Sequence, residues 1–377
     1  MNIAWFTDTW LPTRDGVVTS LQSFKEELEQ RGHQVYLFVP GTENRDDTEE
    51  NIFYYRGHIL HSYPSYRVPS LFSLLSRRTE HHIEKIQPDI IHSHGPAVMG
   101  IHAVKAAHNN KAPLLFTYHT MLEESLHFVT TSPAIQAVVG RLLRIWLRWY
   151  FHRCQGAIAP SHTAAAEIKR YNEGAIEVIP TGINLERFHQ ADGEAIREHH
   201  DFGDSPVILH VGRIVQEKNL DLLVTAASHI LAERQDAHFV IVGKGPYAPA
   251  VQQHVEKQGL TEHFLFTGFI PDKELPNYYA AADVLAFPST YETQGIVAIE
   301  AMATGTPVVA AAARSLPELI NDGETGFLFE PGNAAALADA VLEALDGDIA
   351  VDATRVASAF SRERCTDRLL SYYERFL

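Results

Sequence analysis

Two carboxylates, Glu292 and Glu300, stand with seven residues between them in the mostly apolar segment STYETQGIVAIEAMATGTPVVA at 289–310. The apolar run before Glu292 predicts a strand, and the pattern over 295–303 predicts a helix that carries Glu300. Amides at the start of such a helix lack intrahelical partners and, with the helix dipole, suit phosphate oxygens. Carboxylates accept hydrogen bonds from hydroxyls but repel bare phosphate. The segment therefore favours a phosphate flanked by polyols, as in a nucleotide sugar.

From these residues alone, Glu292 could instead cap the helix and Glu300 could be a solvated helix residue. A second segment, HVGRIVQEKNLD at 210–221, supplies cations. Arg213 and Lys218 lie there in a loop after another predicted strand, where a guanidinium and an ammonium group could neutralise a diphosphate leaving group. A solvated loop is the alternative for this pair. The two segments together indicate a donor site for a nucleotide diphosphate sugar.

Composition limits the class of protein. The chain has 377 residues, of which 45% are hydrophobic, and a formal net charge of -16, which argues against broad binding to nucleic acid. Only Cys154 and Cys365 are present, so we expect a reducing, cytoplasmic compartment. The N-terminal segment, with Asp8 and no basic region, does not resemble a signal peptide. No apolar run approaches the roughly 20 residues of a membrane span, so we expect peripheral membrane contact at most.

Strand-like and helix-like segments alternate along the chain, which predicts parallel sheets covered by helices on both faces. The pattern lapses over 183–206, which is polar and predicts a linker, and then restarts with VILHVGRI. We therefore expect two α/β halves. Ligands of open parallel sheets bind outside the carboxyl ends of the strands, so two such sheets facing each other would form a cleft between domains.

The order of these elements resembles the retaining glycosyltransferases of family 4, which have the two-domain GT-B fold. The resemblance covers nearly the whole chain and rests on GRIVQEKNLDLL at 212–223, IVGKGP at 241–246, FTGFIPDKELPNYYAAADVLAFPS at 266–289 and the E-x7-E segment. It implies two Rossmann-like domains across a cleft: an acceptor-binding domain at 1–190, a nucleotide-sugar-binding domain at 191–360, and a C-terminal helix at 361–377 that packs back on the N-terminal domain.

The resemblance also implies roles for single residues. Glu300 would bind the ribose hydroxyls and Glu292 the donor sugar, while Arg213 and Lys218 balance charge on the departing nucleotide. No metal or other cofactor is implied, and the reaction would be a front-face displacement in which the leaving phosphate helps to deprotonate the acceptor; covalent catalysis by Glu292 is the alternative. The remaining donor-binding positions are Gly16, Gly243, Phe269, Ile270, Thr293, Gln294, Gly295 and Ile296.

His119, in the element FTYHT, matches the family histidine that faces the donor sugar, and it would position that sugar or orient the acceptor. A strand-end histidine that bonds only to backbone is the alternative. His92 and His94 alternate in IHSHG, a spacing that could suggest a metal site. No third ligand is evident, so we interpret both as structural.

Two basic and apolar segments indicate where the acceptor is met. Over 137–154, arginines share one predicted helical face and aromatic residues supply apolar surface. A second segment, YRVPSLFSLLSRR at 66–78, matches the mobile acceptor-side segment of lipid-directed members. An ordinary packed helix with outward arginines is the alternative for the first segment. We expect contact with anionic lipid headgroups through Arg67, Arg77, Arg78, Arg141, Arg144, Trp146, Arg148 and Trp149.

The segments TYHTMLEESLHF at 117–128 and YETQG at 291–295 look most like the diacylglycerol glucosyltransferases, close to phosphatidylinositol mannosyltransferases. The resemblance implies transfer of glucose from UDP-glucose to a lipid hydroxyl such as that of diacylglycerol, at the inner face of the cell membrane. Alternatives are transfer of mannose or another hexose from a GDP- or UDP-sugar to a phosphoinositide, a soluble sugar or a glycan. A non-catalytic nucleotide-sugar binder and a sugar-nucleotide epimerase are alternatives of other classes.

Overall fold

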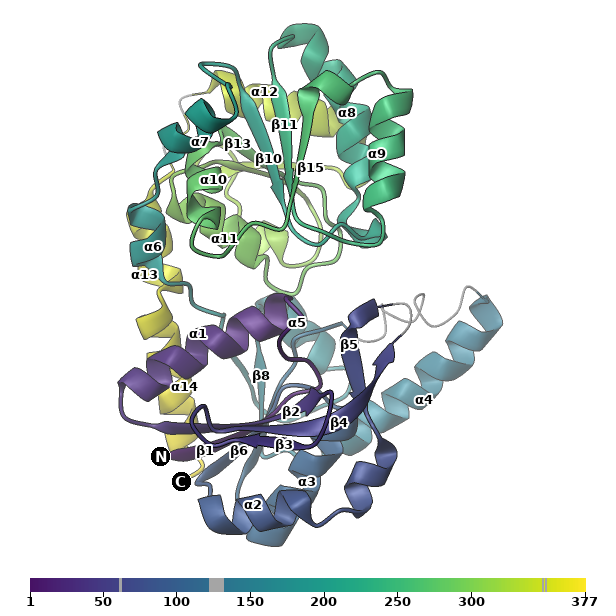
Figure 1. Cartoon of the computed structure of the whole chain (residues 1–377), viewed down its shortest axis with the longest axis vertical. Helices are drawn as coiled ribbons and strands as arrows, with labels where there is room; N and C mark the ends of the chain where they lie inside the picture. Colours follow the sequence, from purple (N-terminus) through teal and green to yellow (C-terminus); the bar gives the residue numbers. More distant parts are fainter. Residues whose placement is uncertain (61–62, 122–131, 348, 350) are drawn as a thin grey trace. The chain divides into compact units, whose positions relative to one another are not determined.

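The structure is a computed structural model that describes residues 1–60, 63–121, 132–347, 349 and 351–377. It divides into two compact units (Figure 1). Unit 1 comprises Met1–Gly182 together with Arg362–Leu377, and unit 2 comprises Ile183–Ser361. Each unit has its own parallel sheet with helices on both faces, so the expected α/β fold class is confirmed.

Unit 1 is built on a nine-stranded sheet in the order β3-β4-β2-β1-β6-β7-β8-β9, with β5 paired to β4. The strands are parallel except β3 and β5, which run antiparallel to β4. Their central members consist of buried apolar runs, as expected of strands covered on both faces. The strands are β1 (Asn2–Phe6), β2 (Gln34–Gly41), β3 (Arg45–Asp47), β4 (Ile52–Leu60), β5 (Tyr63–Pro69), β6 (Ile90–Ser93), β7 (Leu114–Thr117), β8 (Gly156–Ala159) and β9 (Ile176–Val178).

Helices cover both faces of this sheet (Figure 1). One core joins the sheet to α1 (Gly16–Gln30) and the returning α14 (Arg362–Glu374), and the other joins it to α2 (Arg78–Ile86) and α3 (Val98–Asn110). Buried Arg362 fastens α14 to α1, because its guanidinium lies 2.6 Å from Glu26 and 3.3 Å from Glu27. The unit also contains η1 (Leu71–Leu75), α4 (Pro133–Phe151) and α5 (His162–Ile168).

Unit 2 has a six-stranded, fully parallel sheet in the order β12-β11-β10-β13-β14-β15. Its strands are β10 (Val207–Val211), β11 (His238–Val242), β12 (Phe264–Gly268), β13 (Val284–Phe287), β14 (Val308–Ala311) and β15 (Gly326–Phe329). On one face lie α8 (Leu220–Glu233), α9 (Ala248–Lys257) and α12 (Ala334–Asp346); on the other lie α10 (Leu275–Ala281), α11 (Ile296–Ala303) and α13 (Ala353–Phe360). The short turns η3 (Gln216–Lys218), η4 (Thr261–His263) and η5 (Leu316–Glu318) connect them.

The prediction of a polar linker over 183–206 is wrong. This segment folds into α6 (Leu185–His189) and α7 (Gly193–His199), which pack on α10 and α11. Phe188 and Phe202 are buried in the core of unit 2, and Asp192 caps α7 by accepting hydrogen bonds from two backbone amides. Helices this short can be anchored to the core by two isolated aromatic residues. The other residues of the segment are mostly polar, so its sequence resembles a linker.

Candidate active site

The loops that follow β10 and β11 pack so closely that Gly243 has no room for a side chain. The amide of Gly212 donates to the Val242 carbonyl at 3.0 Å, and that of Gly243 donates to the Gly268 carbonyl at 2.7 Å. Gly243 has φ +139°, and a Cβ on it would lie 1.8 Å from the Gly212 carbonyl oxygen. These glycines therefore fix the backbone at the carboxyl edge of the sheet, where ligands of such folds bind.

Lys218 and Glu292 meet at this edge as an ion pair between the Lys218 Nζ and the Glu292 Oε1. Lys218 ends η3 after β10, and Glu292 lies in the loop after β13, the neighbouring strand. Both side chains are largely enclosed, with exposed fractions of 16% and 13%. The Lys218 Nζ also lies 5.6 Å from the centre of the Phe287 ring. The two charges are thus held together at the strand ends of unit 2.

Helix α11 begins beside this ion pair. Gly295 caps it in the left-handed region with φ +86°, and a Cβ there would lie 2.9 Å from the Leu316 Cδ2. The Ser315 hydroxyl donates to the Glu292 carbonyl at 3.1 Å, which fixes the loop that leads into the helix. Thr293, Gln294 and Ile296 flank Gly295, so the expected donor-binding backbone is the start of an observed helix.

Glu300 lies further along α11, where the Tyr279 hydroxyl donates to its Oε2 at 2.7 Å. Burial raises the pKa of Glu300 to about 7, although the Tyr279 bond and nearby Arg187 lower it. Tyr279 is itself fully buried, and its backbone carbonyl accepts from the Thr306 hydroxyl at 2.8 Å. Glu300 is therefore held in one orientation with its other oxygen left for a second partner.

Arg213, Phe269 and Ile270 lie on the same edge of the sheet, in the loops after β10 and β12. Arg213 is half-buried, and its carbonyl accepts from the Val215 amide at 3.0 Å. The Phe269 side chain is 45% exposed, whereas Ile270 packs against the core. The structure thus places the expected donor residues of unit 2 on neighbouring strand ends, and it pairs Lys218 with Glu292 directly.

In unit 1, His119 follows β7 and His94 follows the neighbouring strand β6. The His94 Nδ1 and the His119 Nε2 form a hydrogen bond of 3.0 Å, and the rings stack with centroids 5.3 Å apart. Burial lowers the pKa of His119 to about 4. The buried His94 Nε2 has no partner among the described residues. His94 is therefore a neighbour of His119 that the sequence pattern alone did not identify.

His92 is a satisfied core residue, in agreement with the structural interpretation. Its Nδ1 bonds to the Tyr373 hydroxyl at 2.6 Å and its Nε2 to the Thr117 hydroxyl at 2.8 Å. Tyr373 of α14 also accepts from the Trp5 indole at 3.2 Å. Burial holds the pKa of His92 well below its usual value. Within the described ranges, no three metal-ligating side chains are arranged to hold an ion.

Gly16 begins α1 and is exposed, as a backbone approached by a ligand requires. The residue before it, Asp15, is not among the site residues that the sequence motifs predict. Its carboxylate accepts from the Val18 amide at 3.0 Å and from the Tyr66 hydroxyl at 2.7 Å. An N-cap aspartate before a helix is a recognisable signal, but the link to Tyr66 of β5 depends on the tertiary fold.

The expected membrane-binding residues of α4 differ in exposure. Arg141, Arg144 and Arg148 are exposed, in agreement with an outward arginine face. Trp146 and Trp149 are half-buried, and their rings stack with centroids 4.7 Å apart. The Trp146 indole donates to the Pro96 carbonyl at 3.0 Å. Exposed apolar surface comes instead from Ile135, Val138, Leu142 and Ile145, whose exposed fractions are 51%, 62%, 61% and 57%.

The second segment is also ordered in a specific way. Residues 66–69 belong to β5, and η1 then exposes Leu71, Phe72 and Leu75. Arg67 is half-buried, Arg77 pairs with Glu80 at 3.3 Å, and Arg78 is largely enclosed beside Asp46. Most of the stretch after His119 that carried the diacylglycerol resemblance, residues 122–131, lies outside the described residues. No helix in the described part of the chain has the length and apolarity needed to cross a bilayer.

Comparisons with known proteins agree with this architecture. The family model described as Glycosyltransferase Family 4 matches residues 14–187, and that described as Glycosyl transferases group 1 matches residues 192–359. Alpha-monoglucosyldiacylglycerol synthase of Streptococcus pneumoniae is 31% identical over 92% of this chain and 78% of its own length. The GDP-mannose-dependent alpha-mannosyltransferase of Corynebacterium glutamicum is 29% identical over 88% of this chain and 77% of its own. The crystal structure of Anabaena HepE in complex with UDP superposes with a TM-score of 0.79 at 18% identity, over 100% of both chains.

The two parallel-sheet α/β units have the GT-B fold, and the matched family models and relatives make the chain a glycosyltransferase. The family models that match each half of the chain, and the 31% identity to the Streptococcus pneumoniae relative, then specify the family. The chain belongs to glycosyltransferase family 4, as its sequence motifs predict. It is accordingly an enzyme, a nucleotide-sugar-dependent hexosyltransferase.

Proposed function

We propose that this enzyme transfers glucose from UDP-glucose to a lipid hydroxyl such as that of diacylglycerol, at the inner face of the cell membrane, with retention of anomeric configuration. The observation that carries the donor side is the Lys218–Glu292 ion pair beside the start of α11, with Glu300 further along the same helix. The name of the Streptococcus pneumoniae relative, a monoglucosyldiacylglycerol synthase, supports glucose and diacylglycerol.

The donor is held by three kinds of groups. The backbone from Thr293 to Ile296 accepts the diphosphate at the helix start, where the dipole favours negative charge. Glu300, oriented by Tyr279, accepts from the ribose hydroxyls, and a carboxyl group with a pKa near 7 can form such bonds whether or not it is protonated. Gly16, Gly243, Phe269 and Ile270 complete the donor set through backbone that approaches phosphate or base.

Arg213 and Lys218 stabilise the charge that develops on the leaving diphosphate, so the donor side needs no metal. The pairing of Lys218 with Glu292 serves two purposes. It keeps the ammonium group at the strand ends before donor arrives, and it leaves the second carboxylate oxygen of Glu292 for the hydroxyls of the transferred sugar. The leaving phosphate then deprotonates the acceptor on the same face of the sugar, while neutral His119 hydrogen-bonds the sugar or the acceptor.

The acceptor side rests on the exposed surface of unit 1. Arg141, Arg144 and Arg148 lie on α4 beside the apolar residues Leu142 and Ile145, and η1 adds Leu71, Phe72 and Leu75. Exposed aliphatic and aromatic side chains next to arginines are typical of proteins that rest on an anionic bilayer. A lipid acceptor would be met there without a membrane-spanning helix.

The test is turnover of a panel of UDP- and GDP-sugars by the purified protein, with and without liposomes of diacylglycerol in phosphatidylglycerol, with nucleotide and glycolipid measured separately. Glucolipid formed from UDP-glucose only with diacylglycerol liposomes supports the proposal. Turnover of another donor, or equal nucleotide release without lipid, contradicts it. Isomerisation of the donor without an acceptor would indicate an epimerase.

A second candidate is transfer of mannose from GDP-mannose to a phosphoinositide or to a soluble sugar or glycan. The name of the Corynebacterium glutamicum relative favours this donor, and the base would be met mainly by backbone near Phe269 and Ile270, which selects weakly between uracil and guanine. The same panel separates the two candidates, because the GDP-mannose arm gives a mannosylated product only in the second case.

A further inference from the structure

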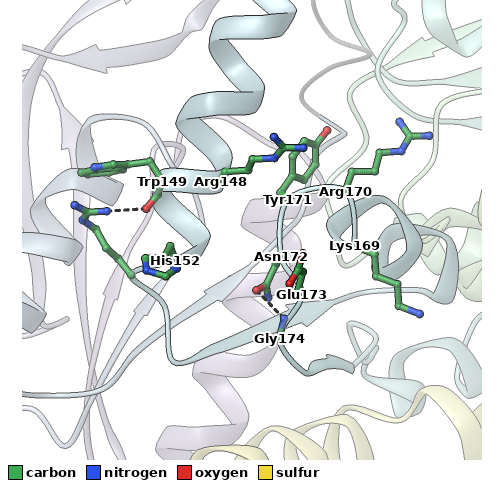
Figure 2. A pocket seen from close by; sticks show the side chains of 10 residues that line it. Arg148, Trp149, His152, Lys169, Arg170, Tyr171, Asn172, Glu173 and Gly174 are labelled. Carbon is green, nitrogen blue, oxygen red and sulfur yellow. Dashed lines mark hydrogen bonds between the residues drawn. The ribbon is translucent and has the colours of Figure 1, made fainter.

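A second concave site lies in unit 1, between the end of α4 and the segment that follows α5. It has a volume of about 790 Å³ and is lined by Arg148, Trp149, Arg153, Lys169, Arg170 and Glu173, among others (Figure 2). Helices α4 and α5 end just before β8 and β9 begin, so this pocket lies at the amino edge of the sheet. His94 and His119 follow strands at the carboxyl edge, and the pocket is therefore separate from the catalytic groups of unit 1.

The pocket is cationic in a protein that is otherwise strongly acidic. Four lining residues, Arg148, Arg153, Lys169 and Arg170, carry positive charge, and Glu173 alone carries negative charge. The whole chain has a formal net charge of -16. A local excess of cations in a concavity attracts an anion that the rest of the surface repels.

Two of these cations are held in place by the protein. The Arg153 guanidinium lies 3.9 Å from the centre of the Trp149 ring and donates to the Trp149 carbonyl at 3.0 Å. Arg170 forms an ion pair of 3.0 Å with the buried Glu167. The pocket thus has a fixed cationic wall on each side before any ligand is bound.

The other two cations, Arg148 and Lys169, are exposed and have no hydrogen-bond or ion-pair partner among the described residues. Figure 2 shows Arg148 extending from α4 toward the segment with Tyr171, from which Lys169 and Arg170 project. Both side chains are long, exposed and without a side-chain partner in the described part of the chain, so they are available to an anion at the pocket. Guanidinium and ammonium groups in this arrangement match the oxygens of a phosphate ester.

The apolar surface of α4 leads into the pocket. Its exposed residues Ile135, Val138, Leu142 and Ile145 are spaced by three, four and three residues, and a further step of four reaches Trp149, which lines the pocket. Residues at these spacings share one face of a helix. An anion that binds here therefore has an apolar surface directly beside it, as a phospholipid requires and a free phosphate does not.

We propose that this pocket binds the phosphate-bearing headgroup of an anionic phospholipid, with the acyl chains along the exposed apolar face of α4. The choice of a lipid rests on the proposed membrane-surface function, whereas the anion site rests on the pocket alone. Such a lipid would be neither donor nor acceptor. It would hold the enzyme on anionic membranes and set the orientation of α4 on the bilayer.

The first experiment measures binding of a soluble lipid to the full chain, without donor or acceptor. Isothermal titration calorimetry compares monomeric dihexanoylphosphatidylglycerol with dihexanoylphosphatidylcholine, glycerol phosphate and inorganic phosphate. We expect saturable binding of the phosphatidylglycerol and clearly weaker binding of the other three. Equal affinity for inorganic phosphate would make this a soluble-phosphate site, and failure of the phosphatidylglycerol to bind would overturn the site altogether.

The second experiment tests the residues. The double variant Arg148→Ala/Lys169→Ala should lose roughly twenty- to thirtyfold in affinity for dihexanoylphosphatidylglycerol, because each cation near an anionic surface contributes about a factor of five. The matched control Arg56→Ala/Lys85→Ala removes the same charge from exposed positions of unit 1 outside the pocket, and it should retain the affinity. Equal losses in both would show general surface attraction and contradict a discrete site.

A conservative variant and the melting temperatures distinguish loss of the binding site from loss of folding. Arg148→Lys should recover much of the affinity that Arg148→Ala loses, and the melting temperatures of all variants should equal that of the parent. If the double variant does not fold, the Arg148→Ala and Arg148→Lys pair decides the proposal alone. Because this binding is measured without turnover, a chain that binds the lipid but makes no glucolipid would contradict the proposed function and leave the pocket supported.

Discussion

In unit 2 the charged groups at the strand ends are paired and enclosed, whereas in unit 1 the charged and apolar groups of α4 face solvent. Lys218 and Glu292 form an ion pair with exposed fractions of 16% and 13%. Gly243 packs against Gly212 in the loop that carries Lys218, and the Ser315 hydroxyl holds the loop that carries Glu292. On α4, Leu142 and Ile145 are more than half exposed beside Arg141. A site that stabilises developing charge must be formed before the ligand arrives, while a surface that rests on a bilayer receives its apolar partners from the lipid.

The largest expected effect comes from the enclosed ion pair. Lys218→Ala should lower kcat by roughly a hundred- to a thousandfold, the usual effect of removing one group that stabilises transition-state charge. The variant also leaves Glu292 enclosed without its cation, so a lower melting temperature is expected as well. Steady-state kinetics with UDP-glucose and liposomes measure the first effect and calorimetry the second.

Lys257→Ala is the matched control for Lys218→Ala, because Lys257 is an exposed cation at the end of α9 in the same unit. It should leave kcat and the melting temperature unchanged. If Lys218→Ala retains near-normal kcat, Lys218 does not stabilise the leaving group, and the proposed contrast between a preformed donor site and an open lipid surface is contradicted.

Backbone packing at the donor edge gives the next largest effect. Gly243→Ala should destabilise the protein by about 3 kcal/mol or more, since the new Cβ would lie 1.8 Å from the Gly212 carbonyl oxygen and the residue would keep a strained φ of +139°. Gly259→Ala is the control, because Gly259 has φ +71° and open space around its Cβ position. Its cost should be only the strain, about 1 kcal/mol. Urea unfolding measures both, and equal costs would contradict close loop packing.

The two units should also respond differently to acid. Burial lowers the pKa of His119 and His102 in unit 1 to about 4 and raises that of Asp8 to about 6. In unit 2 it lowers the pKa of His210 to about 4 and raises that of Glu300 to about 7. A lowered histidine pKa stabilises the fold above pH 6.5 and loses this contribution as the pH falls to 4. A raised carboxyl pKa acts in the opposite sense, because its contribution is full below the unfolded value and is lost as the pH rises through the folded one.

Among the described residues of unit 1, burial lowers the pKa of six histidines and raises that of one carboxyl, Asp8; the histidines are His33, His82, His92, His94, His102 and His119. In unit 2 it lowers the pKa of three histidines, His200, His210 and His238, and raises that of Glu300, so the excess of histidines is smaller there. Between pH 6.5 and 4.5 each such histidine costs about 1.4 kcal/mol per pH unit, so unit 1 should open first. Hydrogen exchange by peptide, corrected for intrinsic rates, measures this at pH 7 and pH 5. Glu300→Gln removes the opposing carboxyl and should make unit 2 more acid-sensitive than it is in the parent chain. Earlier opening of unit 2 in the parent chain would contradict the assignment.

The sequence predicts the strands and the helix that carry the proposed donor residues, because the signals for these elements are local. Apolar runs mark the strands, and the start of α11 at Gly295 follows from the change of pattern after Glu292. The bond between His94 and His119 could not be predicted, since it depends on β6 and β7 being neighbours in the sheet. The prediction of a polar linker over 183–206 is wrong because Phe188 and Phe202 are isolated apolar residues in a polar segment. Their burial depends on contact with the core of unit 2, which includes residues of α10, and the local sequence does not show this contact. Long-range contacts, in short, lie outside what a local pattern contains.

The exposed face of α4 should give a smaller effect, confined to the membrane. Leu142→Ser/Ile145→Ser should weaken binding to phosphatidylglycerol liposomes about tenfold or more, because each aliphatic side chain transferred from water contributes roughly 1.5–3 kcal/mol when fully buried. The melting temperature should not fall, since both residues are exposed in the free protein. Leu377→Ser is the control, because Leu377 is 65% exposed at the C-terminus of the chain. Equal weakening by this control would remove α4 as the membrane surface.

The smallest effect distinguishes two roles for Trp146, which the sequence places among the membrane-binding residues and the structure ties to the Pro96 carbonyl. Trp146→Phe keeps an aromatic ring beside Trp149 but loses the indole donor, so we expect a stability loss of about 1 kcal/mol. Liposome binding should stay close to that of the parent, because the half-buried ring packs within unit 1. The reverse result would be weaker liposome binding with unchanged stability. It would show that Trp146 contacts lipid, and that the membrane-binding surface of α4 includes the face on which Trp146 packs beside Trp149.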